Sequence, residues 1–329
     1  MTPSVAKKIK SFYDRFKEDD AVLVLINADP DAIASAMAVK QLLQQHVDRV
    51  TLSHINVIER PDNIAMVNLL NAGLVHVDRI KPKRFSRFVI LDSQPSHNEI
   101  FGNFTFDAVI DHHPDGGNSN LSPKAFRDIR PEYGATSTIM IEYLKAASIE
   151  PSYKLATALY LGIKTDTSDF ERNALVEDVR AFQFIYQYTN THLARRIEQA
   201  ELKPEFLKYI SRALTRKTIR KNKIIAHIGY VENPDICVII ADFFMRIHSM
   251  KWSIVSGIYD KKLIVVLRND GVSRDAGKTA KKIFDQIGSA GGHKSMARAE
   301  LPMDVFARET GKKTGKDIQA WLVQQFTPH

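Results

Sequence analysis

The sequence predicts an α/β fold: a mostly parallel sheet with helices on both faces, followed by a second, smaller α/β domain. In the first half of the chain, short apolar runs end in acidic or turn residues, and segments with helical spacing separate them. Strands that alternate with helices form parallel sheets, which are covered on both faces. The length of 329 residues exceeds what one hydrophobic core usually serves, so we expect two domains.

Four apolar runs predict the buried strands of the first domain. They are AVLVLIN at 21–27, RVTLSHI at 49–55, RFVILD at 87–92 and FDAVID at 106–111. Helical spacing follows two of them, at 32–47 and 63–73, and dominates from 134 to about 200. A polar and basic stretch then separates a second set of strands and helices. The predicted organisation is a domain at 1–200, a linker at 201–222 and a domain at 223–329.

Composition limits the class of protein. A formal charge of +8 and a pI near 9.3 favour an anionic partner, such as a nucleotide or nucleic acid. Cys237 is the single cysteine, which excludes an intramolecular disulfide and a cysteine metal cluster, so a reducing cytoplasm is expected. The N-terminus lacks the apolar core of a signal peptide, and the apolar runs are shorter than the roughly 20 residues of a membrane span. We therefore predict a soluble, cytoplasmic protein.

Acidic residues and histidines follow the predicted strands. Ligands bind beyond the carboxyl ends of parallel strands, where neighbouring loops converge. The residues of this kind at strand or helix ends are Asp29, Asp31, Asp92, Asp111, His112, His113 and Asp166. Taken singly, Asp29 and Asp31 suit a helix N-cap, and Asp92 suits a turn. Their joint occurrence in four separate segments favours one shared site.

Such a group of carboxylates repels itself unless cations neutralise it. Carboxylates with one or two imidazoles suit Mn²⁺ or Mg²⁺ better than zinc, and Mn²⁺ is our expectation. Two such ions about 4 Å apart activate water and stabilise an in-line leaving group, which is the chemistry of phosphoester hydrolysis.

The same segments carry a family resemblance. NADPDAIAS, LDSQPS, IDHHPD and ALYLGIKTDTSDF resemble, in order and spacing, the four motifs of the DHH phosphoesterases. GSAGGHKSMARA resembles the glycine-rich signature of the DHH-associated substrate-binding domain, and LRND at 267–270 resembles its preceding arginine strand. The resemblance covers nearly the whole chain. It implies a metal-binding catalytic domain at 1–200 and a substrate-binding domain at 223–329.

The resemblance also implies roles for individual residues. Asp29 and Asp92 would hold a first metal ion, and Asp31, Asp92, His112 and Asp166 would surround a second. Asp111 would orient His112, and the catalytic His113 would face the substrate phosphate and assist the leaving oxygen. Arg268 and His293 would bind phosphate, with Gly291 and Gly292 allowing the backbone to approach it.

Three features depart from the family pattern. Leu25 occupies the position of a histidine found in many members, which implies a weaker first metal site. Ser289 and Ala290 stand where glycines are usual, and Pro30 replaces the glycine between the two motif aspartates. These changes put the turnover rate and the substrate in question rather than the fold.

The length and the two-domain layout most resemble the nanoRNase and pAp phosphatase branch of the family. This resemblance implies short RNA or DNA oligonucleotides, or small nucleotides such as pAp, as substrates. We expect no membrane partner, and a homodimer is possible. A cyclic-dinucleotide phosphodiesterase or polyphosphatase is the enzymatic alternative, and a nucleotide-binding protein with reduced or lost catalysis is the alternative from another class. His97 is a further weak candidate. The acid-free basic stretch 212–223 suits either a nucleic-acid backbone or an exposed helix face.

Overall fold

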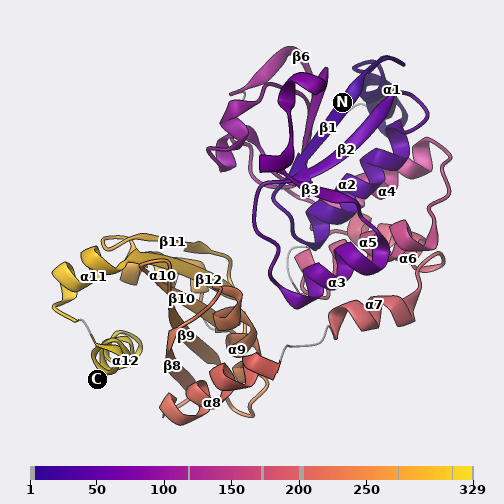
Figure 1. The fold of residues 1–329 in the computed structure, drawn as a ribbon. Helices are drawn as coiled ribbons and strands as arrows, with labels where there is room; N and C mark the ends of the chain where they lie inside the picture. Colours follow the sequence, from indigo (N-terminus) through magenta and orange to yellow (C-terminus); the bar gives the residue numbers. More distant parts are fainter. Residues whose placement is uncertain are drawn as a thin grey trace. The chain divides into compact units, whose positions relative to one another are not determined.

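The computed structural model describes residues 4–117, 119–171, 174–199, 204–272, 274–312 and 314–327. The chain divides into two compact units, Met1–Glu201 (unit 1) and Leu202–His329 (unit 2), each with its own sheet (Figure 1). None of the helices in the described part of the chain has the length and apolar character needed to cross a bilayer.

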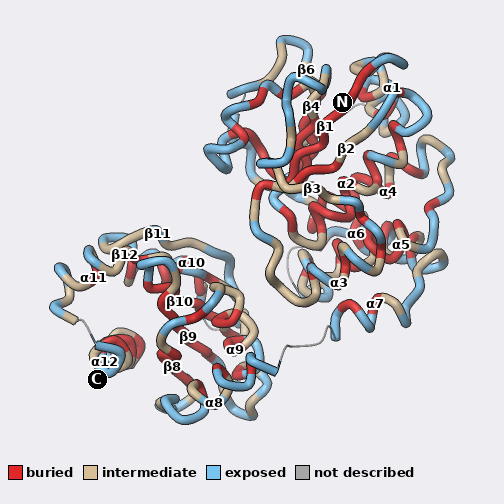
Figure 2. Tube along the Cα trace, in the orientation of Figure 1, coloured by how far each residue is buried: buried red, intermediate tan, exposed pale blue. Residues whose placement is uncertain are grey.

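Unit 1 is built on a six-stranded parallel sheet in the order β3-β2-β1-β4-β5-β6. The strands are β1 Ala21–Ile26, β2 Arg49–His54, β3 Leu74–His76, β4 Arg87–Leu91, β5 Phe106–Asp111 and β6 Leu121–Ile129. Every residue of β1 is buried, as expected for a strand covered on both faces (Figure 2). The strand order reverses between β1 and β4, and ligands bind at such a switch point beyond the strand ends.

Helices cover both faces of this sheet, which confirms the predicted fold class. One face packs against α1 Val5–Tyr13, α2 Pro30–Leu43, α3 Pro61–Leu70, α4 Thr136–Ala146, α5 Tyr153–Asp166, α6 Val176–Tyr186 and α7 Thr191–Glu198. The other face is covered by connecting segments and short 3-10 helices, among them η1 Val77–Arg79, η2 Pro82–Arg84 and η4 Phe101–Asn103, around Phe101 and Phe106.

Unit 2 holds a mixed six-stranded sheet in the order β11-β12-β10-β9-β8-β7, in which β8 and β9 are parallel and the other pairs antiparallel. Its strands are β7 Thr218–Arg220, β8 Lys223–Tyr230, β9 Trp252–Tyr259, β10 Lys262–Asn269, β11 Ser289–Gly292 and β12 Met296–Pro302. Its helices are α8 Leu207–Arg216, α9 Asp235–Met245, α10 Ala276–Phe284, α11 Met303–Thr310 and α12 Gly315–Phe326, with the short η5 Pro204–Phe206 before them. Separate apolar clusters fill the two faces.

The prediction of a linker at 201–222 was wrong for the part of it that the structure describes. Tyr209 and Ala213 of α8 are buried against β8 and α9, and β7 pairs with β8. The many basic side chains of this stretch suggested an exposed connection. The few apolar positions between them are enough to dock one face of α8 on the sheet.

Candidate metal centre

The first acidic segment connects β1 to α2. Asp29 is the N-cap of α2, and its Oδ1 accepts a hydrogen bond of 2.9 Å from the backbone N–H of Ala32. Pro30 follows in the first turn of the helix, where the fixed φ of proline is favourable. The glycine-to-proline departure in this motif is therefore compatible with its backbone geometry.

Asp31 is fully buried and is held by the start of another helix. Its Oδ2 accepts the backbone N–H of Thr136 at 2.6 Å, and its Oδ1 accepts that of Ser137 at 2.8 Å. Both donors are orphan amides of the first turn of α4, which favour a negative charge. Gly162 of α5 allows this close packing, since a Cβ there would lie 3.0 Å from Asp31 Oδ1.

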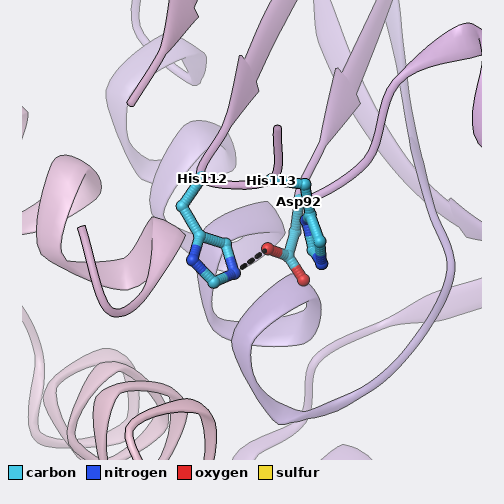
Figure 3. Close-up of side chains that lie close together, drawn as sticks. All are labelled: Asp92, His112 and His113. Atoms are coloured by element: carbon cyan, nitrogen blue, oxygen red, sulfur yellow. Dashed lines mark ion pairs between the residues drawn. The ribbon is translucent and has the colours of Figure 1, made fainter. Parts of the chain in front are cut away.

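Asp92 follows β4 and faces His112, which follows β5 (Figure 3). The Asp92 backbone has a φ of 54°, a left-handed conformation in which Asp and Asn are enriched. Its Oδ1 accepts the Thr136 hydroxyl at 2.8 Å and lies 3.5 Å from His112 Nε2. The turn after β4 therefore aims this carboxylate at the histidine.

His112 has one fixed nitrogen and one that faces acids. Its Nδ1 lies 3.1 Å from the backbone oxygen of Tyr133, and its Nε2 lies 3.1 Å from Asp166 Oδ2. Among the described residues, Nε2 is a buried atom without a hydrogen-bond partner. A neutral imidazole fixed through one nitrogen presents the other as a metal ligand.

Four predicted ligands converge on one point. One ligand atom from each of Asp31, Asp92, His112 and Asp166 lies within 4.8 Å of the others, and the same holds for the group Asp92, His112 and His113. Asp29 is in neither group, although its carboxylate interacts electrostatically with Asp166 and Asp31. These side chains come from α2, the turn after β4, the turn after β5 and the end of α5.

Asp111 is fully buried and orients the loop after β5. Its Oδ1 accepts the ring Nδ1–H of His113 at 2.8 Å and the backbone N–H groups of His112 and His113. Its Oδ2 accepts Gln94 Nε2 at 2.7 Å. Gln94 also donates to the backbone oxygen of Pro114 at 3.1 Å, so one amide side chain fixes both the aspartate and the loop beyond it.

Mutual repulsion shifts the acids of this cluster. Burial and the neighbouring Asp166 carboxylate raise the pKa of Asp29 to about 7 and that of Asp31 to about 6. Burial, with the charges of Asp31 and Asp29, raises the pKa of Asp92 well above its ordinary value. The excess of negative charge calls for a cation.

The histidines respond in the opposite sense. Burial alone would lower the pKa of His112, but the contact with Asp166 raises it to about 9. The hydrogen bond to Asp111 raises the pKa of His113. Burial would raise the pKa of Asp111, but the bonds from His113 and Gln94 hold it below its ordinary value. Both shifts favour the pair of an ionised Asp111 and a protonated His113.

Leu25 and His97 lie around the cluster without joining it. Leu25 is fully buried in the apolar layer of the second sheet face, so no nitrogen ligand comes from that position. His97 Nδ1 accepts the backbone N–H of Gln94 at 3.2 Å, and its ring centre lies 5.7 Å from that of His113.

In unit 2, the predicted phosphate-binding residues lie near one turn. Arg268 on β10 is paired in register with Met296 on β12, and its Nε donates to Asp242 at 2.6 Å. Gly292 has a φ of 148°, a conformation that only glycine adopts easily, and it precedes the exposed His293. A Cβ at Gly291 would meet nothing within 4 Å.

The structure explains why residues other than glycine are tolerated at positions 289 and 290. Ser289 and Ala290 lie in β11 and pair with Glu300 and Ala299 of β12. Side chains are ordinary in such an antiparallel pair, so these departures leave the turn itself unchanged.

Sequence analysis missed three groups at the centre: Gln94, Thr136 and Ser137. A buried Gln in a loop has no periodicity that marks it. Thr136 and Ser137 act on Asp31 through backbone N–H groups, which any residue type supplies. Thr136 was detectable only as a hydroxyl at a helix start.

The chain is similar to known proteins. Residues 21–163 match the DHH family, N-terminal domain. The chain is 31% identical over 307 residues to an uncharacterized protein of Methanocaldococcus jannaschii, and the match covers 93% of this chain. The chain spans 63% of the length of that relative.

Two solved structures share the fold. An exopolyphosphatase-related protein from Bacteroides fragilis superposes with a TM-score of 0.72 and 16% identity, over 97% of this chain and 96% of that one. Exonuclease RecJ bound to manganese gives a TM-score of 0.50 and 11% identity, over 98% and 95% of the two chains. At these identities the similarity concerns the fold.

Proposed function

We propose that this chain, which belongs to the DHH family through its N-terminal domain, is a metal-dependent phosphoesterase that hydrolyses short oligonucleotides or nucleotide phosphates such as pAp. The observation that supports this most is the convergence of Asp31, Asp92, His112 and Asp166 on one point. A structural role alone would not gather ionisable groups that raise one another's pKa, because buried unpaired charge is strongly unfavourable.

The residues present fit divalent cations. Carboxylate oxygens dominate, and the single buried His112 Nε2 lacks a hydrogen-bond partner in the described part of the chain. This donor set suits Mn²⁺ or Mg²⁺. We assign Asp31, Asp92, His112 and Asp166 to one ion, and Asp29 with the shared Asp92 to another. Bound divalent cations supply a water of lowered pKa and neutralise the phosphoryl charge.

His113 is suited to hold a proton at the leaving oxygen. Its Nδ1 is engaged by Asp111, which leaves Nε2 for the substrate. The same contact raises its pKa, so the imidazolium persists to higher pH than an isolated histidine. Asp111 fixes the ring and stabilises its charge.

Charge distribution supports an anionic substrate on unit 2. Leu202–His329 has 23 Lys and Arg against 12 Asp and Glu, whereas Met1–Glu201 has 23 against 26. We assign phosphate binding there to Arg268, Gly291, Gly292 and His293. Arg268 would share its guanidinium between Asp242 and a phosphate oxygen.

A substrate screen tests the proposal. We expect the manganese-supplemented protein to release phosphate from pAp or mononucleotides from the dinucleotide pApA, measured by chromatography of the products. A cyclic dinucleotide and inorganic polyphosphate distinguish the other phosphoesterase activities. Nucleotide binding without any product in Mn²⁺ or Mg²⁺ would contradict hydrolysis and indicate a binding protein.

Gln94 offers a separate test of how the loop after β5 is oriented. We expect Gln94→Met, which keeps the shape but removes the amide, to lower kcat by roughly 10- to 100-fold with little change in KM. The reason is that Asp111 and the loop after it lose their fixed donor. Since His113 would then lose its ordered partner, the basic limb of the pH–rate profile should also move to lower pH.

The matched control is Gln187→Met, because Gln187 is exposed and, among the described residues, donates only to the backbone oxygen of Phe184. That variant should retain parental kinetics. A Gln94→Met enzyme with unchanged kcat and pH profile would show that Asp111 and His113 are oriented without Gln94.

A further inference from the structure

At one end of the strands of the unit 2 sheet, which we call an edge, the glycine signature lies beside segments that are distant from it in sequence. Strand register pairs Lys223 of β8 with Trp252 of β9, and Trp252 with Asn269 of β10. On the far side of β10, Arg268 pairs with Met296 of β12. The starts of β8, β9 and β12 and the end of β10 therefore share the edge at which β11 turns into β12.

Exposed cations extend along this edge from the signature. We call them the cationic edge: Lys294, Arg274, Lys251, Lys221 and Arg220. Backbone and side-chain hydrogen bonds tie their loops together, since Ala276 N donates to Lys294 O at 2.8 Å and Asn269 Nδ2 donates to Arg274 O at 2.7 Å. Lys251 N donates to Asn222 O at 2.8 Å, which joins the β9 start to the turn after β7.

The acids of unit 2 leave this row positively charged. Its described salt bridges join other pairs, namely Lys208–Glu232, Lys262–Glu300, Arg268–Asp242, Arg298–Glu300 and Arg308–Glu309. Two carboxylates lie near the edge, those of Asp270 and Asp275, whose Oδ1 atoms accept Val272 N at 3.1 Å and Lys278 N at 2.8 Å, and they offset only part of the charge of the five cations. Burial, with the nearby charges of Arg274 and Lys221, lowers the pKa of Lys223, as expected in a positive field.

The basic stretch 212–223 is split by the fold. Arg212 donates to the backbone oxygen of Tyr230 at 3.3 Å, and a Cβ at Gly229 would lie 3.3 Å from Arg216 NH1. Both arginines are therefore at the opposite end of β8. Only the last part of the stretch lies on the same edge as the glycine signature. Substitutions in its first part can therefore serve as controls for substitutions in its last part.

We propose that the cationic edge binds the sugar–phosphate backbone of a single-stranded oligonucleotide longer than a dinucleotide, whose terminal phosphate occupies the signature at His293. This inference rests on the proposed function and specifies its substrate length. Strands lie about 4.8 Å apart, so three strand spacings separate β12 from β8 by roughly 14 Å. That span exceeds one nucleotide and suits a chain of about four, at the lower end of single-strand site sizes.

The chemistry of the edge suits a backbone without sequence preference. Lysine and arginine contacts to phosphates supply affinity that does not depend on the base. The exposed apolar residues near the row, Ile219 at 41% and Val272 at 80% exposure, offer contact surface to any base. Binding should therefore depend on length and on salt.

The test compares pApA with a five-nucleotide RNA by calorimetry, using the full chain with Asp92→Asn so that no substrate is consumed. We expect the pentanucleotide to bind about tenfold or more tightly than the dinucleotide at low salt. The triple variant Lys221→Ala, Lys251→Ala, Arg274→Ala should lose this preference and reduce the slope of log K against log salt by about 2, at about 0.7 per contact. Its dinucleotide affinity should stay within about twofold.

The matched control is Arg212→Ala, Arg216→Ala, Lys217→Ala, which removes the same charge from the other half of the stretch and should keep the pentanucleotide preference. Equal affinity of the parent for both lengths, or an equal loss with both triple variants, would overturn the proposal. So would tight binding of inorganic pentaphosphate without oligonucleotide binding. This experiment measures binding alone. Absence of hydrolysis in the substrate screen would therefore refute the proposed function without deciding whether the cationic edge binds oligonucleotides.

Discussion

Asp92→Ala should reduce hydrolysis on the order of 10³-fold or more while the protein remains folded. Asp92 and His112 both belong to the two groups of converging ligands, and Asp92 is the carboxylate that the groups share. Its Oδ1 lies 3.5 Å from His112 Nε2. Alanine removes a ligand that both proposed ions share. Product release from pAp or pApA in Mn²⁺ measures the loss, and circular dichroism checks the fold.

Asp92→Asn separates loss of charge from loss of shape. Asparagine tolerates the left-handed φ of 54° and keeps an acceptor for the Thr136 hydroxyl, so it should be equally inactive without backbone strain. Asp48→Asn is the control, because Asp48 is exposed and, within the described part of the chain, pairs only with Arg49 at 3.5 Å. Activity of Asp92→Asn near the parental level would contradict the shared-ligand role.

The strands of unit 1 were the part of the fold that the sequence predicted most readily. Continuous apolar runs identified β1, β2, β4 and β5, because buried parallel strands need apolar side chains on both faces. Sequence analysis missed β3, Leu74–His76, which is too short to show a pattern, and β6, Leu121–Ile129, whose exposed edge position tolerates polar residues and Pro123.

From the pattern of strands alone, only the acidic residues that directly follow strands could be placed together. Asp29, Asp92 and Asp111 follow strands, and parallel strands bring their carboxyl ends to one edge. The contact between Asp166 and His112 depends instead on how α5 docks on α2, which the absence of a side chain at Gly162 permits. Packing of this kind is a property of three-dimensional complementarity and leaves little local pattern.

The second large effect expected is that Asp92→Asn stabilises the metal-free protein at pH 8. Burial and the charges of Asp31 and Asp29 raise the pKa of Asp92 in the folded state above its ordinary value. A carboxyl with a raised folded pKa holds its proton more tightly when folded, so stability falls as pH rises from about 4 towards that raised value. Asparagine stays neutral and avoids this loss. We expect its melting temperature in chelator to exceed that of the parent by about 5 °C at pH 8.

The same comparison at pH 5 should show a smaller difference, because only the first part of the fall in stability that begins near pH 4 has then occurred. Titrating groups outside the cluster are common to both proteins and cancel in the difference, whereas loss of the Asp92 charge also relieves its repulsion with Asp29 and Asp31 and acts in the same direction. Added Mn²⁺ should reverse the order at pH 8, since cations bind the ionised parental cluster and stabilise the folded state, whereas the variant lacks the shared ligand. Equal melting temperatures of parent and variant in chelator at pH 8 would show that Asp92 carries no unfavourable charge in the folded state. Equal stabilisation of both proteins by Mn²⁺ would show that Asp92 is not a metal ligand.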